Sequence, residues 1–122
     1  KYVSQPDLRV FDYLQSAERP TTVIYKGALG LADNLIAADG SVGIRLVKDE
    51  FCRHLIRRFK KPIVSTSANI SGQPAPPCFS AIDNAVIRSV DYVVKYRQND
   101  ETQRQPSAVI IWNNDGTIQQ LR

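Results

Sequence analysis

The chain has 122 residues, of which 43% are hydrophobic and 23% charged, and it contains only 6 Gly and 7 Pro. This composition suits one globular domain with a single core over residues 1–122 and excludes the disordered and low-complexity classes. The formal net charge of +4 permits contact with nucleotides or nucleic acid without requiring it.

The first half of the chain predicts alternating helices and strands. Apolar spacing predicts a helix over residues 6–15, and β-branched residues predict a short strand over 22–25. Residues 26–39 fit either a short helical turn or a loop, because glycines interrupt the pattern. Alternating polarity then predicts a strand over 41–47, and an amphipathic helix is expected to open at residue 48.

The second half ends in a strong hairpin signal. Residues 62–65 read as a short buried strand that leads into a polar loop. Ser80 is expected to cap a helix that runs to residue 88, and 91–96 reads as a further strand. Strands at 107–112 and 117–121 flank an Asn-Asn-Asp-Gly turn. The whole pattern predicts an α/β fold with a twisted mixed sheet, flanking helices and a terminal β-hairpin.

Other features concern the setting in which the protein acts. The longest apolar runs are too short to span a bilayer and no secretory leader opens the chain, so we expect a cytoplasmic location. The chain begins at Lys1 and contains no Met, and we therefore expect it to be part of a longer product. Cys52 and Cys78 lack CxxC spacing, which favours reduced thiols over a metal or redox site.

A dense set of small polar side chains follows the strand predicted at 62–65. Residues 62–72 read PIVSTSANISG, so a buried strand is expected to end in hydroxyl residues and an amide. Such groups can hold a phosphate or a carboxylate, although neither a Walker loop nor a dinucleotide fingerprint is present. The alternative left open is a polar loop whose Ser and Asn side chains satisfy their own turns.

Arg45 lies inside a predicted strand and requires a partner. Its planar guanidinium matches a carboxylate or a phosphate through two parallel hydrogen bonds. A structural acid at the sheet edge is the alternative. If Arg45 and the serine-rich loop converge, one site can hold both a substrate carboxylate and a nucleotide phosphate.

Basic residues gather on the helix predicted after residue 48. Arg53, Arg57 and Lys60 belong to this cluster and could contact an RNA backbone, although basic residues near a helix end also suit the helix dipole. His54 is the only histidine, and no nearby acid or GxSxG elbow suggests a catalytic triad. We expect no metal site built by the chain alone.

The run PIVSTSANISGQP resembles the signature of the YrdC-like family, in which a Lys-x-Arg pair and a Ser-x-Asn pair form the nucleotide site. Three further segments resemble family strands in order and spacing: ERPTTVIY, SVGIRLV and QPSAVII. The resemblance covers nearly the whole chain. Glu18-Arg19 in place of Pro-Gly, and Ala108 in place of Thr, are departures from the pattern.

The resemblance implies a role for particular residues. It implies that the carboxylate of L-threonine is bound by Arg45, Ser65 and Ser107. It implies that ATP is approached by Ser41, Ser67, Asn69, Arg122 and the backbone near Ala75. It assigns no catalytic nucleophile, only positioning and charge neutralisation.

The reaction implied is that of a threonylcarbamoyl-AMP synthase, which condenses L-threonine, bicarbonate and ATP, with Mg²⁺ on the phosphates. The products are threonylcarbamoyl-AMP and pyrophosphate, and downstream threonylcarbamoyl-transfer proteins then modify adenosine 37 of tRNA. The implied partners therefore include tRNA or double-stranded RNA, and no membrane.

The Lys-x-Arg pair has no match before Glu18, so half of the implied phosphate clamp is not found in these residues. We expect the 122 residues alone to show little or no synthase activity. Two rival functions stay open: an RNA-binding module of the same fold without catalysis, and a carbamoyl-transfer domain within a larger maturation protein.

Overall fold

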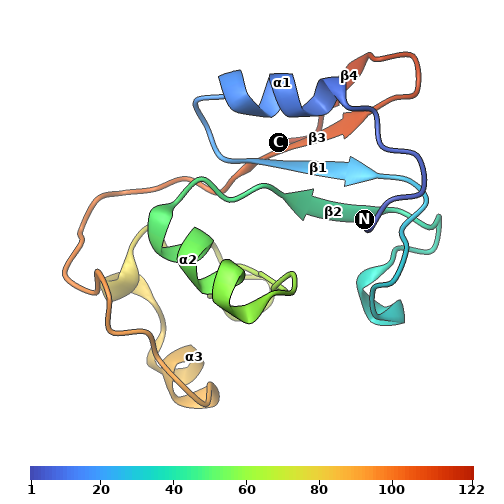
Figure 1. The fold of residues 1–122 in the computed structure, drawn as a ribbon. Coiled ribbons are helices and arrows are strands. Elements are labelled where there is room, and N and C mark those ends of the chain that lie inside the picture. The colour runs from blue at the N-terminus through green and yellow to red at the C-terminus, as the bar shows by residue number, and fades with distance from the viewer. The chain divides into compact units, whose positions relative to one another are not determined.

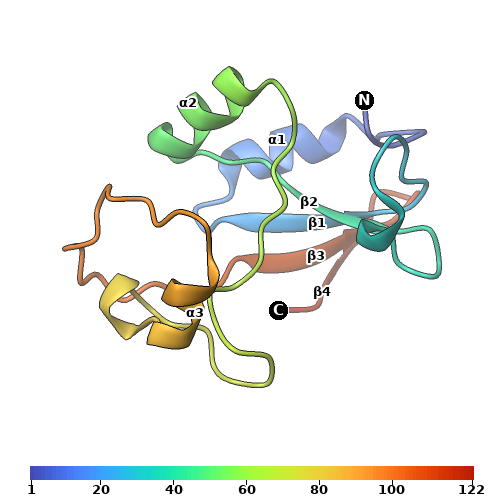
Figure 2. The same cartoon turned by 90° about the horizontal axis from the view of Figure 1, so that it is seen from below.

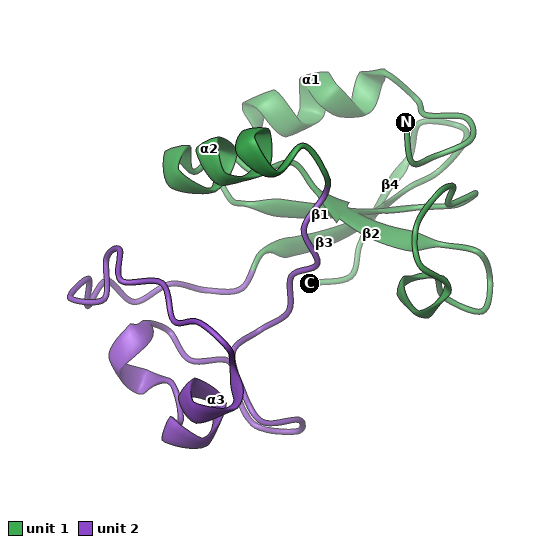
Figure 3. Ribbon diagram, turned by 60° about the horizontal axis from the view of Figure 1, so that its bottom comes forward, with its two compact units in different colours: residues 1–61, 107–122 green, residues 62–106 purple.

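The computed structural model describes all residues from 1 to 122, and the chain divides into two compact units (Figure 3). Unit 1 comprises Lys1–Lys61 and Ser107–Arg122, and unit 2 comprises Pro62–Pro106. Unit 2 is therefore a single continuous segment inserted into the sequence of unit 1.

Unit 1 contains a four-stranded mixed sheet with the strand order β2-β1-β3-β4 (Figure 1). Its strands are β1 (Thr21–Tyr25), β2 (Val42–Arg45), β3 (Ala108–Trp112) and β4 (Ile118–Gln120). β1 runs antiparallel to β2 and parallel to β3, and β3 and β4 form an antiparallel pair. The α/β class, the mixed sheet and the terminal hairpin are confirmed.

Helix α1 (Arg9–Ser16) covers one face of this sheet (Figure 1). Val10 and Leu14 on the helix pack against Val23 and Ile110 on the central strands, and all four are at least 95% buried. Full burial of each such side chain contributes roughly 1.5–3 kcal/mol, so this cluster holds unit 1 together.

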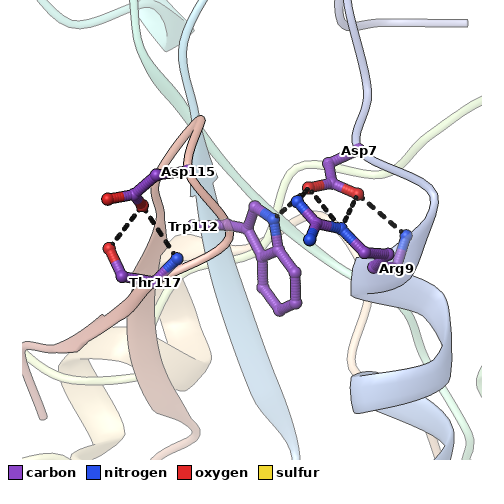
Figure 4. A network of polar contacts seen from close by, with 5 residues as sticks. All are labelled: Asp7, Arg9, Trp112, Asp115 and Thr117. Carbon is purple, nitrogen blue, oxygen red and sulfur yellow. Dashed lines mark hydrogen bonds and ion pairs between the residues drawn. The ribbon is translucent and has the colours of Figure 1, made fainter.

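The amino-terminal end of α1 is tied to the hairpin by a polar network (Figure 4). The Trp112 indole N–H donates to Asp7 Oδ2 at 2.9 Å, and Arg9 Nη2 lies 2.6 Å from the same oxygen. The Arg9 guanidinium, and then the Trp112 N–H, hold the pKa of the Asp7 carboxyl well below its ordinary value. Because Asp7 also accepts the backbone N–H of Arg9, the helix begins later than the predicted residue 6.

A glycine in the hairpin turn makes room for this network. Gly116 has a φ of +82°, and a Cβ added there would lie 2.8 Å from Arg9 Nη2. Asp115 fixes the turn, since Oδ1 accepts the N–H of Thr117 at 2.9 Å and its hydroxyl at 2.6 Å (Figure 4).

Helix α2 (Glu50–Phe59) is present as predicted and begins two residues after the expected residue 48. The Asp49 side chain accepts the backbone N–H of Cys52 at 3.0 Å and caps the helix. Lys60 ends it in a left-handed conformation with a φ of 62°. No residue of α2 is buried, and Leu55 and Phe59 on its apolar side are 46% and 55% exposed.

Residues 26–39, for which the sequence left a short helical turn and a loop open, contain one 3₁₀ turn, η1 (Asp33–Leu35).

Unit 2 contains the 3₁₀ turn η2 (Phe79–Ala81) and helix α3 (Asn84–Ser89). The predicted helix is present but starts later, because Asp83 caps it through the N–H of Ala85 at 2.7 Å. Ser80, the predicted cap, instead donates its hydroxyl to Glu101 Oε2 at 2.8 Å.

The strands predicted at 62–65 and 91–96 are wrong, since both segments are irregular. No residue between 62 and 106 is buried, and Val64 and Tyr92 are 63% and 71% exposed. Residues with high β propensity form a strand only where a partner strand and a half-buried surface are available. No strand of the sheet pairs with residues 62–65 or 91–96, so these segments stay irregular.

The α-helices contain 8, 10 and 6 residues. No helix in the chain is long and apolar enough to cross a membrane.

Candidate binding site

The sheet of unit 1 has a second face, opposite α1, seen from below in Figure 2. Side chains alternate along a strand, and paired residues on neighbouring strands project from the same face. Thr22 pairs with Arg45 on β2 and with Val109 on β3, so these three residues share the second face. A contact of 3.0 Å between Thr22 Oγ1 and Ser107 Oγ places Ser107 there too.

Arg45 occupies the carboxyl end of β2 and is exposed. No hydrogen bond or ion pair joins its guanidinium to another residue of the chain, so the expected alternative of an acid at the sheet edge is not found. A guanidinium without a protein partner can bind a carboxylate or phosphate through its full planar fork.

Ser107 and Arg122, predicted for different ligands, lie beside each other. Arg122 Nε donates to the backbone carbonyl of Ser107 at 3.0 Å, and Arg122 Nη2 lies 3.5 Å from Ser107 Oγ. Two hydroxyls and one guanidinium, from Thr22, Ser107 and Arg45, thus lie on the second face, and the Arg122 guanidinium lies beside Ser107. This set carries positive charge and hydrogen-bond donors, which suits an anion.

Ser41 lies at the other end of β2 from Arg45. Four residues of extended strand span about 13 Å, so the structure does not place these two side chains together. The Ser41 hydroxyl donates to Asp39 Oδ1 at 2.6 Å, and this bond, with the backbone N–H of Ser41, lowers the pKa of Asp39. The contact of Ser41 with ATP stays a prediction.

The Ser-x-Asn segment lies in unit 2, within an irregular loop rather than at a strand end. Asn69 Nδ2 donates to the carbonyls of Ile70 and Gln73, each at 3.0 Å, and its Oδ1 is buried without a partner. The predicted alternative of a self-satisfied turn thus holds for the amide donors of Asn69, while its oxygen has no partner in the chain.

The remaining predicted residues of unit 2 are exposed. They are Ser65, Ser67 and Ala75. No side-chain hydrogen bond engages either serine hydroxyl.

A pocket of about 250 Å³ lies next to Arg45 within unit 1. The end of α1, the start of β1 and the connection from β2 to α2 line it. Lys48 joins these elements, because its ammonium donates to the carbonyls of Gln15 at 3.3 Å and Ala17 at 2.8 Å. These two bonds satisfy two carbonyl groups at the carboxyl end of α1.

Arg53 and Arg57 border a second hollow of about 300 Å³ on α2, together with Lys48 and His54. His54 Nε2 lies 3.7 Å from Glu50 Oε1, and both side chains are exposed. Lys60 follows directly as the residue that ends the helix. The predicted cluster of basic residues is therefore presented to solvent by one helix.

Thr22 is the residue of this site that the sequence did not single out. The signal was available, since Thr22 is the threonine of the segment that resembles the Pro-Gly-Pro-x-Thr strand. Its position beside both Arg45 and Ser107 depends on the pairing of residues 85 positions apart in sequence.

No group of three or more His, Cys, Asp or Glu side chains could hold a metal ion. The Arg45 guanidinium and the hydroxyls of Thr22 and Ser107 on its face of the sheet suit the phosphate oxygens of a nucleotide better than the Mg²⁺ that accompanies them.

Residues 4–122 match the model of the Sua5/YciO/YrdC family, described as telomere recombination. The chain belongs to this family. It is 39% identical over 75 residues to a protein named as a candidate threonylcarbamoyl-AMP synthase in Methanocaldococcus jannaschii, covering 62% of this chain and 34% of that protein. It is 32% identical over 80 residues to the carbamoyltransferase HypF of Synechocystis sp., covering 65% of this chain and 10% of that protein. The matched segment thus spans about a third and a tenth of these relatives. No solved structure matches the chain significantly.

Proposed function

We propose that this family member is part of an L-threonylcarbamoyladenylate synthase, a nucleotidyltransferase of the cytoplasm. Such an enzyme condenses L-threonine, bicarbonate and ATP to threonylcarbamoyl-AMP and pyrophosphate. The observation that carries the proposal is the exposed Arg45 guanidinium, which has no partner in the chain and lies on one sheet face with Ser107. The name of the archaeal relative supports the choice of reaction.

In this proposal the second face of the unit 1 sheet holds the threonine carboxylate. Arg45 supplies a bidentate partner for the two carboxylate oxygens, and the Ser107 hydroxyl supplies a further donor. Arg122, which contacts Ser107, would neutralise phosphate charge. The chain places no activated nucleophile here, so its contribution is to orient the reactants and offset their charge.

In unit 2, the side chains proposed to contact the nucleotide are Ser67 and Asn69, and Ser65 is the one proposed to contact threonine. Ser67 offers an exposed hydroxyl, and the buried Oδ1 of Asn69, which has no partner in the chain, would accept a donor group of the nucleotide once the loop opens around it. Mg²⁺ would arrive with the phosphates of ATP, where it stabilises the charge that develops on them.

Binding of L-threonine to the 122-residue chain tests this proposal without requiring turnover. We expect isothermal calorimetry to detect L-threonine, and Arg45→Ala to weaken it about tenfold or more, since hydrogen bonds to charged groups are worth about 1.5–3 kcal/mol. Arg53→Ala is the matched control, because it removes an exposed arginine of the same unit on α2. Absence of binding, or equal affinity in the Arg45 and Arg53 variants, would overturn the proposal.

A second candidate is a carbamoyl-transfer domain within a larger protein, which the match to the carbamoyltransferase of Synechocystis favours. This function needs an anion site but no pocket for the threonine side chain. Binding of glycine as tight as that of L-threonine, and equally sensitive to Arg45→Ala, would favour it over the synthase.

Contact with tRNA or double-stranded RNA through α2 is a separate proposal. Arg53 and Arg57 face the same hollow one helical turn apart, and Lys60 follows them. Neutralising these three residues should weaken RNA binding and reduce its dependence on salt, whereas Arg45→Ala should leave it unchanged. RNA affinity that is indifferent to the three substitutions would exclude this surface.

A further inference from the structure

Thr22 lies between the two residues proposed to bind the carboxylate. It pairs directly with Arg45 on β2, and its Oγ1 lies 3.0 Å from Ser107 Oγ at the entry to β3. Directly opposed side chains on antiparallel strands start about 5 Å apart, so Thr22 adjoins both partners. It is half-buried, which limits its freedom to turn toward water.

Packing determines which way the Thr22 side chain points. Gly43, on the β2 side of Thr22, has no side chain, and a Cβ built there would lie 3.2 Å from Thr22 Cγ2. The methyl group therefore occupies the space toward β2, while the hydroxyl points toward Ser107 on the β3 side. A β-branched residue has few χ1 choices, and this contact selects one of them.

The direction of the bond between the two hydroxyls then matters for ligand binding. Ser107 Oγ has one proton, and Arg122 Nη2, 3.5 Å away, can only donate. If Ser107 donates to Thr22, no proton is left for an anion. If Thr22 donates to Ser107, the Ser107 proton is free to point at an anion held by Arg45, and each bond polarises the next.

We propose that Thr22 is a positioning residue of the carboxylate site, which donates its hydroxyl proton to Ser107 and so directs the Ser107 hydroxyl toward the anion bound by Arg45. This inference rests on the proposed function, because L-threonine is taken as the anion. Thr22 itself acts through Ser107 and does not contact the ligand.

The test compares variants that keep the shape of Thr22 with variants that keep its hydroxyl. Thr22→Val retains the methyl group against Gly43 and removes the hydroxyl, and we expect calorimetry to show L-threonine binding about fivefold weaker. Thr22→Ser retains the hydroxyl, and we expect affinity within about twofold of the unaltered chain. Thermal melts of each variant check that the fold is kept, and Thr22→Ala replaces Thr22→Val if the latter does not fold.

A double-mutant cycle with Ser107→Ala separates positioning from a purely structural role. We expect Thr22→Val to weaken binding in the unaltered chain but to have no further effect once Ser107 is alanine. An equal loss in both backgrounds, or no loss from Thr22→Val alone, overturns the inference while leaving the synthase proposal intact. If the unaltered chain binds no L-threonine, the proposed function and this inference fall together.

Discussion

Unit 1 and unit 2 differ in whether they have a buried core. In unit 1, Val23 and Ile110 are 0% and 1% exposed beneath α1, and the sheet orders residues far apart in sequence. In unit 2 no residue is buried, and its local structure depends on polar contacts, among them the bond from Ser80 to Glu101. One such contact pairs Asp100 with Arg104 at 2.7 Å, and hydrogen bonds from Thr102 and then Arg104 lower the pKa of Asp100 to about 2.

This difference also applies to the residues proposed to bind ligands, which are divided between the two units. Arg45, Thr22 and Ser107 are held by a sheet with a core, so the anion-binding face exists before a ligand arrives. Ser67 and Asn69 belong to a loop in which no residue is buried. Ordering such a loop when a ligand binds costs conformational entropy, and this cost weakens the affinity. We therefore expect ligand contacts from unit 1 to be preorganised and those from Ser65, Ser67 and Asn69 in unit 2 to be formed at a cost.

The largest test of this contrast removes buried volume from unit 1. We expect Ile110→Ala to lower the free energy of unfolding by about 3 kcal/mol, because it deletes fully buried methyl groups and leaves a cavity. Trp112 is the only tryptophan and lies on β3, so its fluorescence during urea denaturation reports on unit 1. Val64→Ala is the matched change in unit 2, and at 63% exposure it should shift the transition by less than about 0.5 kcal/mol. Similar losses would mean that the units share one core.

The same contrast explains which elements the sequence predicts correctly. Strands at 21–25 and 108–112 combine β-branched residues with partners that pair along their length, and both were predicted. Residues 62–65 and 91–96 carry similar local signals, yet strand formation needs a partner that sequence pattern does not identify. Helix α2 was predicted because its amphipathic spacing is a local signal, and the Asp49 cap that starts it is a local interaction too.

The candidate site shows the same division between local and distant information. Arg45 was recognisable because a charged residue within a strand is unusual, and its freedom from a partner became evident only in the fold. Thr22 was not singled out, because its role depends on Ser107, 85 residues away, and on Gly43 across the strand pair. Register between strands is determined by long-range packing, which a single sequence does not specify.

The next largest effect concerns acid stability of unit 1. The folded-state pKa of Asp7 lies well below the ordinary value of 3.8, owing first to Arg9 and then to Trp112. Ionised Asp7 thus contributes stability that is fully present above about pH 4 and is lost as the pH falls toward the folded pKa. We expect Asp7→Asn to lower the melting temperature at pH 7 and to make it less dependent on pH between 4 and 2. Asp12→Asn, an exposed change on the helix that follows Asp7, is the control, and equal acid sensitivity of both variants would contradict the prediction.

Helix caps give a smaller effect that again differs between the units. Asp49→Ala removes the acceptor for the Cys52 N–H at the start of α2, and we expect a loss of about 1 kcal/mol in the transition followed by Trp112 fluorescence. Asp83→Ala removes the corresponding cap of α3 in unit 2. It should reduce helical circular dichroism without moving the fluorescence transition. A fluorescence shift from Asp83→Ala would show that α3 supports the sheet.

The smallest effect comes from the link between α1 and the start of α2. The Lys48 ammonium donates to the carbonyls of Gln15 and Ala17, where the helix dipole favours a positive charge. We expect Lys48→Met, which keeps most of the aliphatic stem, to lower the free energy of unfolding of unit 1 by about 0.5 kcal/mol, and added salt to diminish the difference. Lys61→Met provides the control at an exposed lysine of the same unit, with no change expected. If Lys48→Met stabilises unit 1 instead, packing of the aliphatic side chain in the pocket contributes more to stability than the charge at the end of α1. The hydrogen bonds from Lys48 to Gln15 and Ala17 would then add no stability to the part of unit 1 that carries Arg45.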